Sequence, residues 1–398
     1  MQSTEAVGTA LTIDSSAHLD MLRAGAAFLV LISHWRMLLF VDWPQANHRK
    51  ILLYFFYWIT KLGHQAVIVF FVLSGFLVGG SVLRSVGAGN WSAKRYMVHR
   101  LTRLEIVLVP ALFLCWFWDS LGSHLFRPSP IYLGTAGINV LPYGIRLSTS
   151  IPVFLGNVVF LQNLAVPSFG SDDPLWSLTN EFWYYLLFPC CVIVLASSFR
   201  WKSKILAGLG ALSIAALVGK PILGGFLIWM LGAGLFVLPA PPAWFSHRLR
   251  SVAFLSAALF VTLQLGLTYS PYQFEAGYAD YVLGALFAIF MYFVLHHCWA
   301  TGPRYRKFAR ATAGSSYTLY VTHMPVLVFV EAWIGHRWLP DWKHFFAADL
   351  LLGLPLIFAA VVAMLFERNT DRVRKRIEAW AGLSRPVAAA AGELPLRA

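Results

Sequence analysis

The sequence predicts an all-α membrane protein: a polytopic bundle of about ten transmembrane helices plus a short re-entrant or interfacial helix, with no soluble domain. Of the 398 residues, 58% are hydrophobic and only 12% are charged. Apolar runs long enough to cross a bilayer recur along the whole chain. We expect spans at residues 19–41, 65–84, 98–119, 174–198, 203–219, 222–238, 251–268, 279–298, 313–333 and 345–366.

The apolar run 151–166 decides the predicted topology. If this run crossed the membrane, the basic clusters before and after it would lie on opposite sides. They lie on one side only when it does not cross, so we expect it to be re-entrant or interfacial. The positive-inside rule then places the clusters and both termini in the cytoplasm, in a multi-pass protein of the inner or plasma membrane. The clusters are Arg84 to Arg103, Arg200 to Lys204, Arg248 with Arg250, Arg304 to Arg310, and Arg368 to Arg376.

Three segments follow from this scheme. Residues 1–18 form a cytoplasmic N-terminal segment, 19–368 the membrane domain, and 369–398 a basic, partly disordered cytoplasmic tail. The outer segment, residues 120–173, is the only sizeable piece outside the membrane and is too short for an independent catalytic domain. The apolar run Ile51 to Lys61 is too short to cross alone, so it extends the second span or lies in the interface.

The charge and the cysteines exclude several classes of function. The 31 Lys and Arg exceed the 18 Asp and Glu, but they are spread over short loops between spans. We therefore expect contacts with membrane lipid and none with nucleic acid. The four cysteines lie in apolar runs without CxxC spacing or a nearby His at metal-ligand spacing. The sequence thus indicates neither a disulfide framework nor a metal site.

Two ionisable residues of the first span share one face. Arg23 and His34 are eleven residues apart, which on a helix brings them within roughly 20° of each other and about 16 Å along the axis. Ionisable groups in a span are costly and usually line a cavity, so the pair is a candidate site. Two structural interpretations stay open: Arg23 held by Asp20 or extending to the interface, and His34 as a neutral imidazole on a backbone carbonyl.

The cytoplasmic mouth of the predicted bundle carries further candidates. Arg100 and Arg103 face nearly the same way on a helix and can clamp a phosphate, or they can serve only as topology-setting charges beside headgroups. Arg84 can assist them. The stretch 67–81 contains Ser74 and several glycines, which favour close helix packing or leave room for a slim ligand tail.

Two polar residues of later spans complete the candidate set. Glu181 is the only acidic residue within an apolar run of the middle third, and His34 lies at a compatible depth to be its partner. A structural hydrogen bond to backbone or to aromatic neighbours is the alternative. His323 lies in mid-span, and because Pro325 follows, support of a helix kink is its simpler interpretation.

Five blocks of the chain, in order, resemble the acyltransferase 3 family of integral membrane O-acyltransferases. LDMLRAGAAFLVLISHWR resembles the family's opening LDGLRGLAALLVVxxH, and AVIVFFVLSGFLVGG its FFVLSGFL block. HRLTRLEIVLVP is similar to its RxxR helix, PLWSLTNEFWYYLLFP to LWSLxxEExFYLLFP, and SSYTLYVTHMPVL to SYxLYLxHxPxL. The resemblance extends from residue 19 to about 366. It departs from the pattern at Met21, Ala24 and Gly25, and at Phe182, where the family has a second glutamate.

The resemblance implies transfer of an acyl group, most often acetyl in this family and sometimes succinyl, from cytoplasmic acyl-CoA to a hydroxyl. The acceptor would be a cell-surface or exported glycan or a small hydroxylated molecule. His34 would be the general base, with Glu181 and Arg23 beside it, and Arg100, Arg103, Ser74 and Arg84 would bind the donor. No metal and no tightly bound cofactor are required. Since no esterase-like domain is fused to the chain, the acyl group goes directly to the acceptor or to a separate periplasmic or extracellular partner protein.

A transport function remains the alternative. A secondary transporter or a flippase for a glycan or lipid-linked sugar also has about ten spans, with intramembrane Arg, His and Glu as a proton relay. The sequence shows no half-to-half repeat and no pair of broken helices in corresponding positions, which disfavours this class.

Overall fold

The computed structural model describes residues 11–46, 51–138, 144–242, 276–296 and 300–383, together with short pieces between residues 244 and 259. These residues form helices and turns, and no β-strand occurs among them. The principal helices are α1 (Ile13–Leu39), α2 (Ile51–Ile59), α3 (Gly63–Ser74), α4 (Gly80–Gly87), α5 (Ala93–Leu125), α6 (Pro130–Leu133), α7 (Ile151–Val158), α8 (Trp176–Leu195), α9 (Trp201–Val237), α12 (Ala276–His296), α13 (Pro303–Ala313), α14 (Ser316–Ile334), α15 (Trp342–Leu365) and α16 (Thr370–Trp380).

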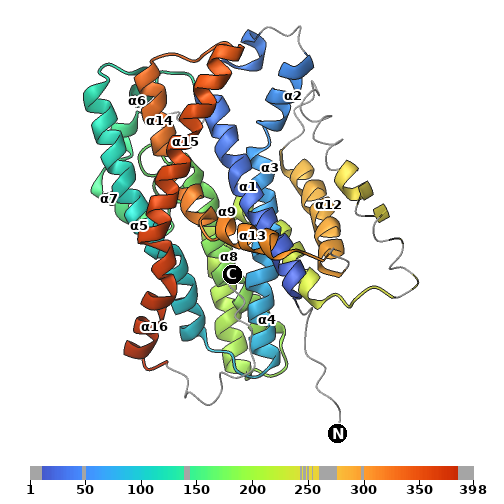
Figure 1. The fold of residues 1–398 in the computed structure, drawn as a ribbon. Coiled ribbons are helices and arrows are strands. Elements are labelled where there is room, and N and C mark those ends of the chain that lie inside the picture. Colours follow the sequence, from blue (N-terminus) through green and yellow to red (C-terminus); the bar gives the residue numbers. More distant parts are fainter. Residues whose placement is uncertain are drawn as a thin grey trace.

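Eight described helices or helix chains are long and apolar enough to cross a membrane, which confirms the predicted all-α membrane bundle (Figure 1). The first begins earlier than the apolar run suggested. Thr12 and Ser15 form a reciprocal capping box, with the Ser15 amide donating to the Thr12 hydroxyl and the Thr12 amide donating to the Ser15 hydroxyl. This cap satisfies amide groups that a helix start leaves open. Helix α1 therefore starts at Ile13, inside the segment 1–18 that the sequence assigned to the N-terminal extension.

Helix α9 contains both of the spans predicted at 203–219 and 222–238. Its backbone breaks at Gly219, which has φ 68° and ψ −178°. The half before the break runs antiparallel to α8, because Gly208 lies near Val194 and Gly210 near Cys190. The half after the break runs parallel to α8, as the ring contacts of Tyr184 with Phe226 and of Phe188 with Trp229 show. The chain thus reverses at Gly219, at a φ that suits only glycine.

The predicted span 251–268 falls mostly outside the described residues. The second half of α9 and helix α12 nevertheless run parallel, since Gly224 lies near Tyr281 and Gly284 lies near Ile228. Helices α1 and α14 also run side by side in the same direction, because Arg23 contacts Ala313 just before α14 and His34 contacts His323.

The run 151–166 does not cross. It forms the eight-residue helix α7, followed by turns, which is far too short for a bilayer. As a result α4, the start of α5, the turn between α8 and α9, and α16 gather at one end of the bundle, the lower end in Figure 1. We call this the basic end. Helix α2 stands at the opposite end, above α3, as an extension of the second span.

The chain after the last span begins with an ordered helix. His99 of α5 bonds to Glu378 of α16, and Lys94 of α5 donates to the carbonyl oxygen of Ala381, which directly follows α16. The part of the predicted tail before residue 384 is therefore packed against α5, and the remainder lies outside the described residues.

Candidate functional site

A pair of histidines joins α1 to α14 in the interior of the bundle. His34 Nδ1 lies 2.8 Å from His323 Nε2, and the planes of the two rings, whose centroids are 5.1 Å apart, are inclined by only 17°. His323 is fully buried, whereas His34 is partly exposed. The other nitrogen of His323, Nδ1, lies 2.9 Å from the carbonyl oxygen of Leu319.

These contacts fix the protons of both rings. A carbonyl oxygen only accepts, so His323 Nδ1 carries a proton and donates it to Leu319. In a neutral His323 the nitrogen Nε2 is then an acceptor, and His34 Nδ1 donates to it. The lone pair of His34 is consequently on Nε2, the nitrogen that faces away from His323. We call this chain from Leu319 through His323 to His34 the histidine relay.

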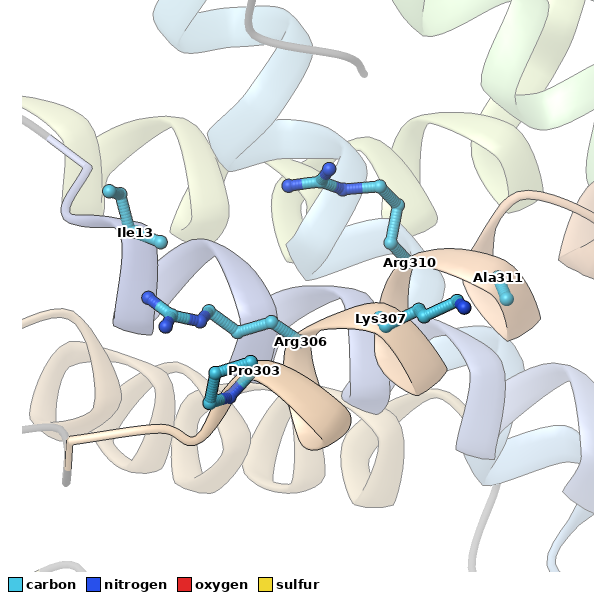
Figure 2. Close-up of a pocket in the computed structure, with 6 residues that line it drawn as sticks. All are labelled: Ile13, Pro303, Arg306, Lys307, Arg310 and Ala311. Atoms are coloured by element: carbon cyan, nitrogen blue, oxygen red, sulfur yellow. The ribbon is translucent and has the colours of Figure 1, made fainter.

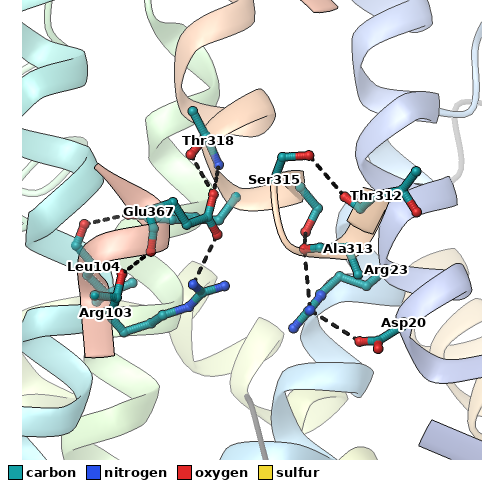
Figure 3. A network of polar contacts seen from close by, with 12 residues as sticks. Asp20, Arg23, Arg103, Leu104, Thr312, Ala313, Ser315, Thr318 and Glu367 are labelled. Carbon is teal, nitrogen blue, oxygen red and sulfur yellow. Dashed lines mark hydrogen bonds and ion pairs between the residues drawn. The ribbon is translucent and has the colours of Figure 1, made fainter. Parts of the chain in front are cut away.

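A second polar cluster, the arginine layer, lies toward the basic end (Figure 3). Arg23 pairs with Asp20 at 3.3 Å and donates to the carbonyl oxygen of Ala313. Arg103 pairs with Glu367 at 3.0 Å, and the two arginine side chains point toward one another between α1 and α5. The predicted local partner of Arg23, Asp20, is thus present.

Glu367 anchors the arginine layer. Its side chain is only 2% exposed and accepts hydrogen bonds from the backbone amide and the hydroxyl of Thr318, at 3.2 and 2.5 Å. A buried carboxylate needs such partners because burial removes its hydration. No sequence pattern indicated a role for Glu367, because it follows the last predicted span at the start of a basic stretch. Thr318 is five residues before His323 on α14, so the contact of Glu367 with Thr318 lies about 7.5 Å from the relay along that helix.

Glu181 takes a different partner from the one expected. Its Oε1 accepts from the Tyr185 hydroxyl at 2.6 Å, one turn further along α8. The expected contact with His34 is wrong, because α14 rather than α8 supplies the neighbour of His34, and that neighbour is His323. The tyrosine hydroxyl also lies 3.3 Å from Ser74, whose oxygen accepts from the Trp229 indole at 3.1 Å.

Arg100 and Arg84 stand beside aromatic rings. The guanidinium of Arg100 lies over Tyr96 and Tyr185, at 5.8 and 5.9 Å from the ring centroids, and its buried Nε has no hydrogen-bond partner among the described residues. Arg84 lies 5.0 Å from the centroid of Phe236. Arg100 is therefore the member of the predicted pair that keeps a free donor, whereas Arg103 is held by Glu367.

The small residues of the stretch 67–81 serve close helix packing. A Cβ added to Gly75 would lie 1.9 Å from the carbonyl oxygen of Trp229, and one added to Gly232 would lie 1.9 Å from that of Val72. The backbone between Gly75 and Gly79 widens into a π-helical turn at this contact. Of the two interpretations, the structure confirms close packing.

Phe182 replaces the family's second glutamate, and its environment explains the replacement. Its ring stacks on Phe160 of the outer segment at a centroid distance of 4.2 Å and an interplanar angle of 13°. A carboxylate at this position would displace an aromatic contact that fixes the outer segment on α8.

The outer segment is tied to the bundle by buried polar groups. Asp119, near the end of α5, accepts from the backbone amide and the hydroxyl of Ser171 at 2.8 and 2.7 Å. Asn157 donates to the carbonyl oxygens of Val153 and Pro167 and accepts from the Phe169 amide. Both carboxylate oxygens of Asp172 are buried without a partner among the described residues, and burial together with Asp119 raises its pKa well above the ordinary value.

The described part of the chain contains no group of three or more His, Cys, Asp or Glu placed to hold a metal ion. Cys115, Cys190 and Cys191 are free thiols, and Cys298 lies outside the described residues. Of the predicted site residues, the structure brings Arg23 and Arg103 together in the arginine layer, and Glu181 and Ser74 together on Tyr185. His34 is joined by a histidine that the sequence assigned to kink support.

Comparison with known proteins agrees with this architecture. The sequence model of a protein family described as an acyltransferase domain matches residues 16–366. The chain is 25% identical over 358 residues to nodulation protein 10 of Rhizobium leguminosarum bv. viciae, covering 82% of this chain and 88% of that protein. An uncharacterised protein of Haemophilus influenzae is 30% identical over 138 residues, which is 33% of this chain and 50% of the other. No solved structure matches. The chain therefore belongs to the acyltransferase 3 family and is a membrane acyltransferase.

Proposed function

We propose that this acyltransferase moves an acyl group, in the first instance acetyl, from acyl-CoA to a hydroxyl of a cell-surface or exported glycan. The observation that carries the proposal is the histidine relay, which leaves a lone pair on Nε2 of a partly exposed imidazole inside a membrane bundle. A positioned neutral imidazole is the usual general base for a hydroxyl.

In the proposed reaction, His34 Nε2 takes the proton of the acceptor hydroxyl while the hydroxyl oxygen attacks the thioester carbonyl. The tetrahedral intermediate then collapses with cleavage of the carbon–sulfur bond. The imidazolium of His34 returns its proton to the departing CoA sulfur, which leaves as the thiol. His323 holds the His34 ring throughout and is a positioning residue.

The donor is proposed to enter from the basic end, which the positive-inside rule assigns to the cytoplasm together with both termini. Acyl-CoA is anionic, and Arg100 forms no ion pair with a described residue, whereas Arg23 pairs with Asp20 and Arg103 with Glu367. Arg100 is therefore the strongest candidate for a donor phosphate. Arg23, Arg103 and Arg84 of α4 also lie along the proposed entrance. Ser74 and Glu181, joined through Tyr185, would border the slot for the acyl-pantetheine arm.

The acceptor is proposed to approach from the opposite end, beside the outer segment. Direct transfer to a glycan or a small hydroxylated acceptor needs only His34, and a separate partner protein outside the membrane could present the glycan. No metal or tightly bound cofactor takes part in this scheme.

The test compares His34→Ala with His64→Ala in purified protein. His64 is a matched control, because its ring pairs with Asp280 at a distance of 3.0 Å and is not part of the hydrogen-bond chain from Leu319 to His34. We expect His34→Ala to abolish transfer of radiolabelled acetyl from acetyl-CoA to the surface glycan fraction, with unchanged elution in detergent, while His64→Ala retains it. Native transfer by His34→Ala would overturn the assignment of the base.

A further inference from the structure

A hollow lined by basic side chains lies at the N-terminal end of α1, against helix α13 (Figure 2). We call it the α13 pocket. It has a volume of about 550 Å³. Arg306 and Arg310 extend toward Ile13, while Lys307 points the other way along α13. The lining residues are Ile13, Pro303, Arg306, Lys307, Arg310 and Ala311.

Helix α13 is clamped to α1 at three points, so the pocket has fixed walls. The amide and hydroxyl of Thr301, just before α13, donate to Asp14. His18 Nδ1 lies 3.0 Å from the Tyr305 hydroxyl, and at the far end of α13 the Ala313 carbonyl oxygen accepts from Arg23.

The cations of the α13 pocket have no close polar partner among the described residues. Arg306, Lys307 and Arg310 make no side-chain ion pair or hydrogen bond with any residue that the structure describes. The acidic residues of α1 whose charges reach them are Asp14 and Asp20. Asp14 accepts hydrogen bonds from Thr301, and Asp20 pairs with Arg23, so neither carboxylate forms an ion pair with the pocket cations. The three cations of the pocket therefore exceed the acidic charge beside them.

The pocket, the arginine layer and the relay follow one another along the axis of α1. Along α1, Ile13, Arg23 and His34 follow at intervals of ten and eleven residues, or about 15 and 16 Å. A donor whose thioester is at His34 and whose arm passes Arg23 would therefore carry its far end to the α13 pocket. In acyl-CoA that far end is an adenosine with its own phosphate on the ribose, separate from the diphosphate.

We propose that the α13 pocket binds the 3′-phosphoadenosine end of the acyl-CoA donor, with Arg306 and Arg310 on the ribose phosphate and Ile13 and Pro303 against the purine. This rests on the proposed donor. Arginine is suited to a phosphate monoester because its planar guanidinium forms two parallel hydrogen bonds. The apolar side chains beside Arg306 supply a surface on which a flat base can lie.

The experiment compares binding of CoA and dephospho-CoA, which lacks only the ribose phosphate, to the full chain in nanodiscs of zwitterionic lipid. We expect the native chain to bind CoA about tenfold more tightly, the effect of roughly one charge-assisted hydrogen bond. The double variant Arg306→Gln and Arg310→Gln should bind both nucleotides with the weaker affinity. Arg304→Gln, on the same helix but outside the pocket, is the matched control and should keep the preference.

The outcomes separate this inference from the proposed function. If the native chain binds neither nucleotide, the proposed donor is wrong and the inference falls with it. If it binds both equally, or if the double variant keeps the tenfold preference, the donor stands and the pocket assignment is overturned. A pocket that holds only anionic lipid headgroups would give no preference for CoA in zwitterionic nanodiscs, and would also overturn it.

Discussion

The histidine relay makes a quantitative prediction at His323. Replacing His323 with Leu introduces an apolar side chain of similar size and removes the acceptor for His34 Nδ1. In the native chain that acceptor, His323 Nε2, lies 2.8 Å from His34 Nδ1. The lost hydrogen bond is worth about 1 kcal/mol, and a buried donor left unsatisfied costs about 1–3 kcal/mol. If this cost falls on the transition state, kcat drops by roughly 10- to 100-fold.

The matched variant is His323→Gln, whose amide oxygen can accept from His34 Nδ1. We expect it to recover most of the kcat lost in His323→Leu, while the KM for acetyl-CoA stays within about twofold in both, because His323 contacts no donor group in the proposed reaction. The assay is incorporation of radiolabelled acetyl into the surface glycan fraction by membranes that contain equal amounts of each variant. A native kcat in His323→Leu, or equal losses in the Leu and Gln variants, would refute the relay.

Three further predictions concern stability, measured as thermal unfolding in detergent. Gly75→Ala should destabilise by about 1–3 kcal/mol because its Cβ meets the Trp229 carbonyl oxygen, whereas Gly25→Ala, with nothing within 4 Å, should not. Glu367→Ala should cost about 3 kcal/mol by leaving Arg103 unpaired, against less than about 1 kcal/mol for Asp371→Ala, whose side chain is half-exposed; equal effects would contradict a buried anchor. The pKa of Asp172 is raised in the folded protein, so its protonated form favours folding. The free energy of unfolding is therefore highest below about pH 4 and falls as the pH rises toward the folded-state pKa, because the unfolded chain ionises first. Asp172→Asn should therefore raise the melting temperature at neutral pH and Asp119→Asn, which disturbs two hydrogen bonds from Ser171, should lower it; the reverse order would contradict this account.

The helices and their grouping could be predicted from the sequence because both depend on local composition. Apolar runs gave the spans, and the basic clusters identified 151–166 as a run that does not cross, which its eight-residue helix α7 confirms. The helix start was missed by six residues, from 19 to 13, because the capping box of Thr12 and Ser15 extends α1 beyond the apolar run.

The partners within the site could not be predicted because they join distant helices. The period of a helix places Arg23 and His34 on one face, but it does not say which helix that face meets. His34 and His323 are 289 residues apart, and Glu367 reaches Thr318 across 49 residues. Glu181 was a plausible partner for His34 by depth alone, and only the packing of α14 beside α1 decides in favour of His323.

A neutral partner for His34 suits the proposed chemistry better than the expected carboxylate. In a low-dielectric interior a carboxylate at hydrogen-bond distance would favour the imidazolium form, which has no lone pair to accept a proton. His323 orients the ring without adding charge. Once His34 has taken the acceptor's proton, no described anion pairs with the imidazolium, so the proton is readily passed to the leaving sulfur. In the proposed reaction the same arrangement makes His34 a base before the attack and an acid after it, while the charged pairs stay in the arginine layer, where we propose that the donor enters.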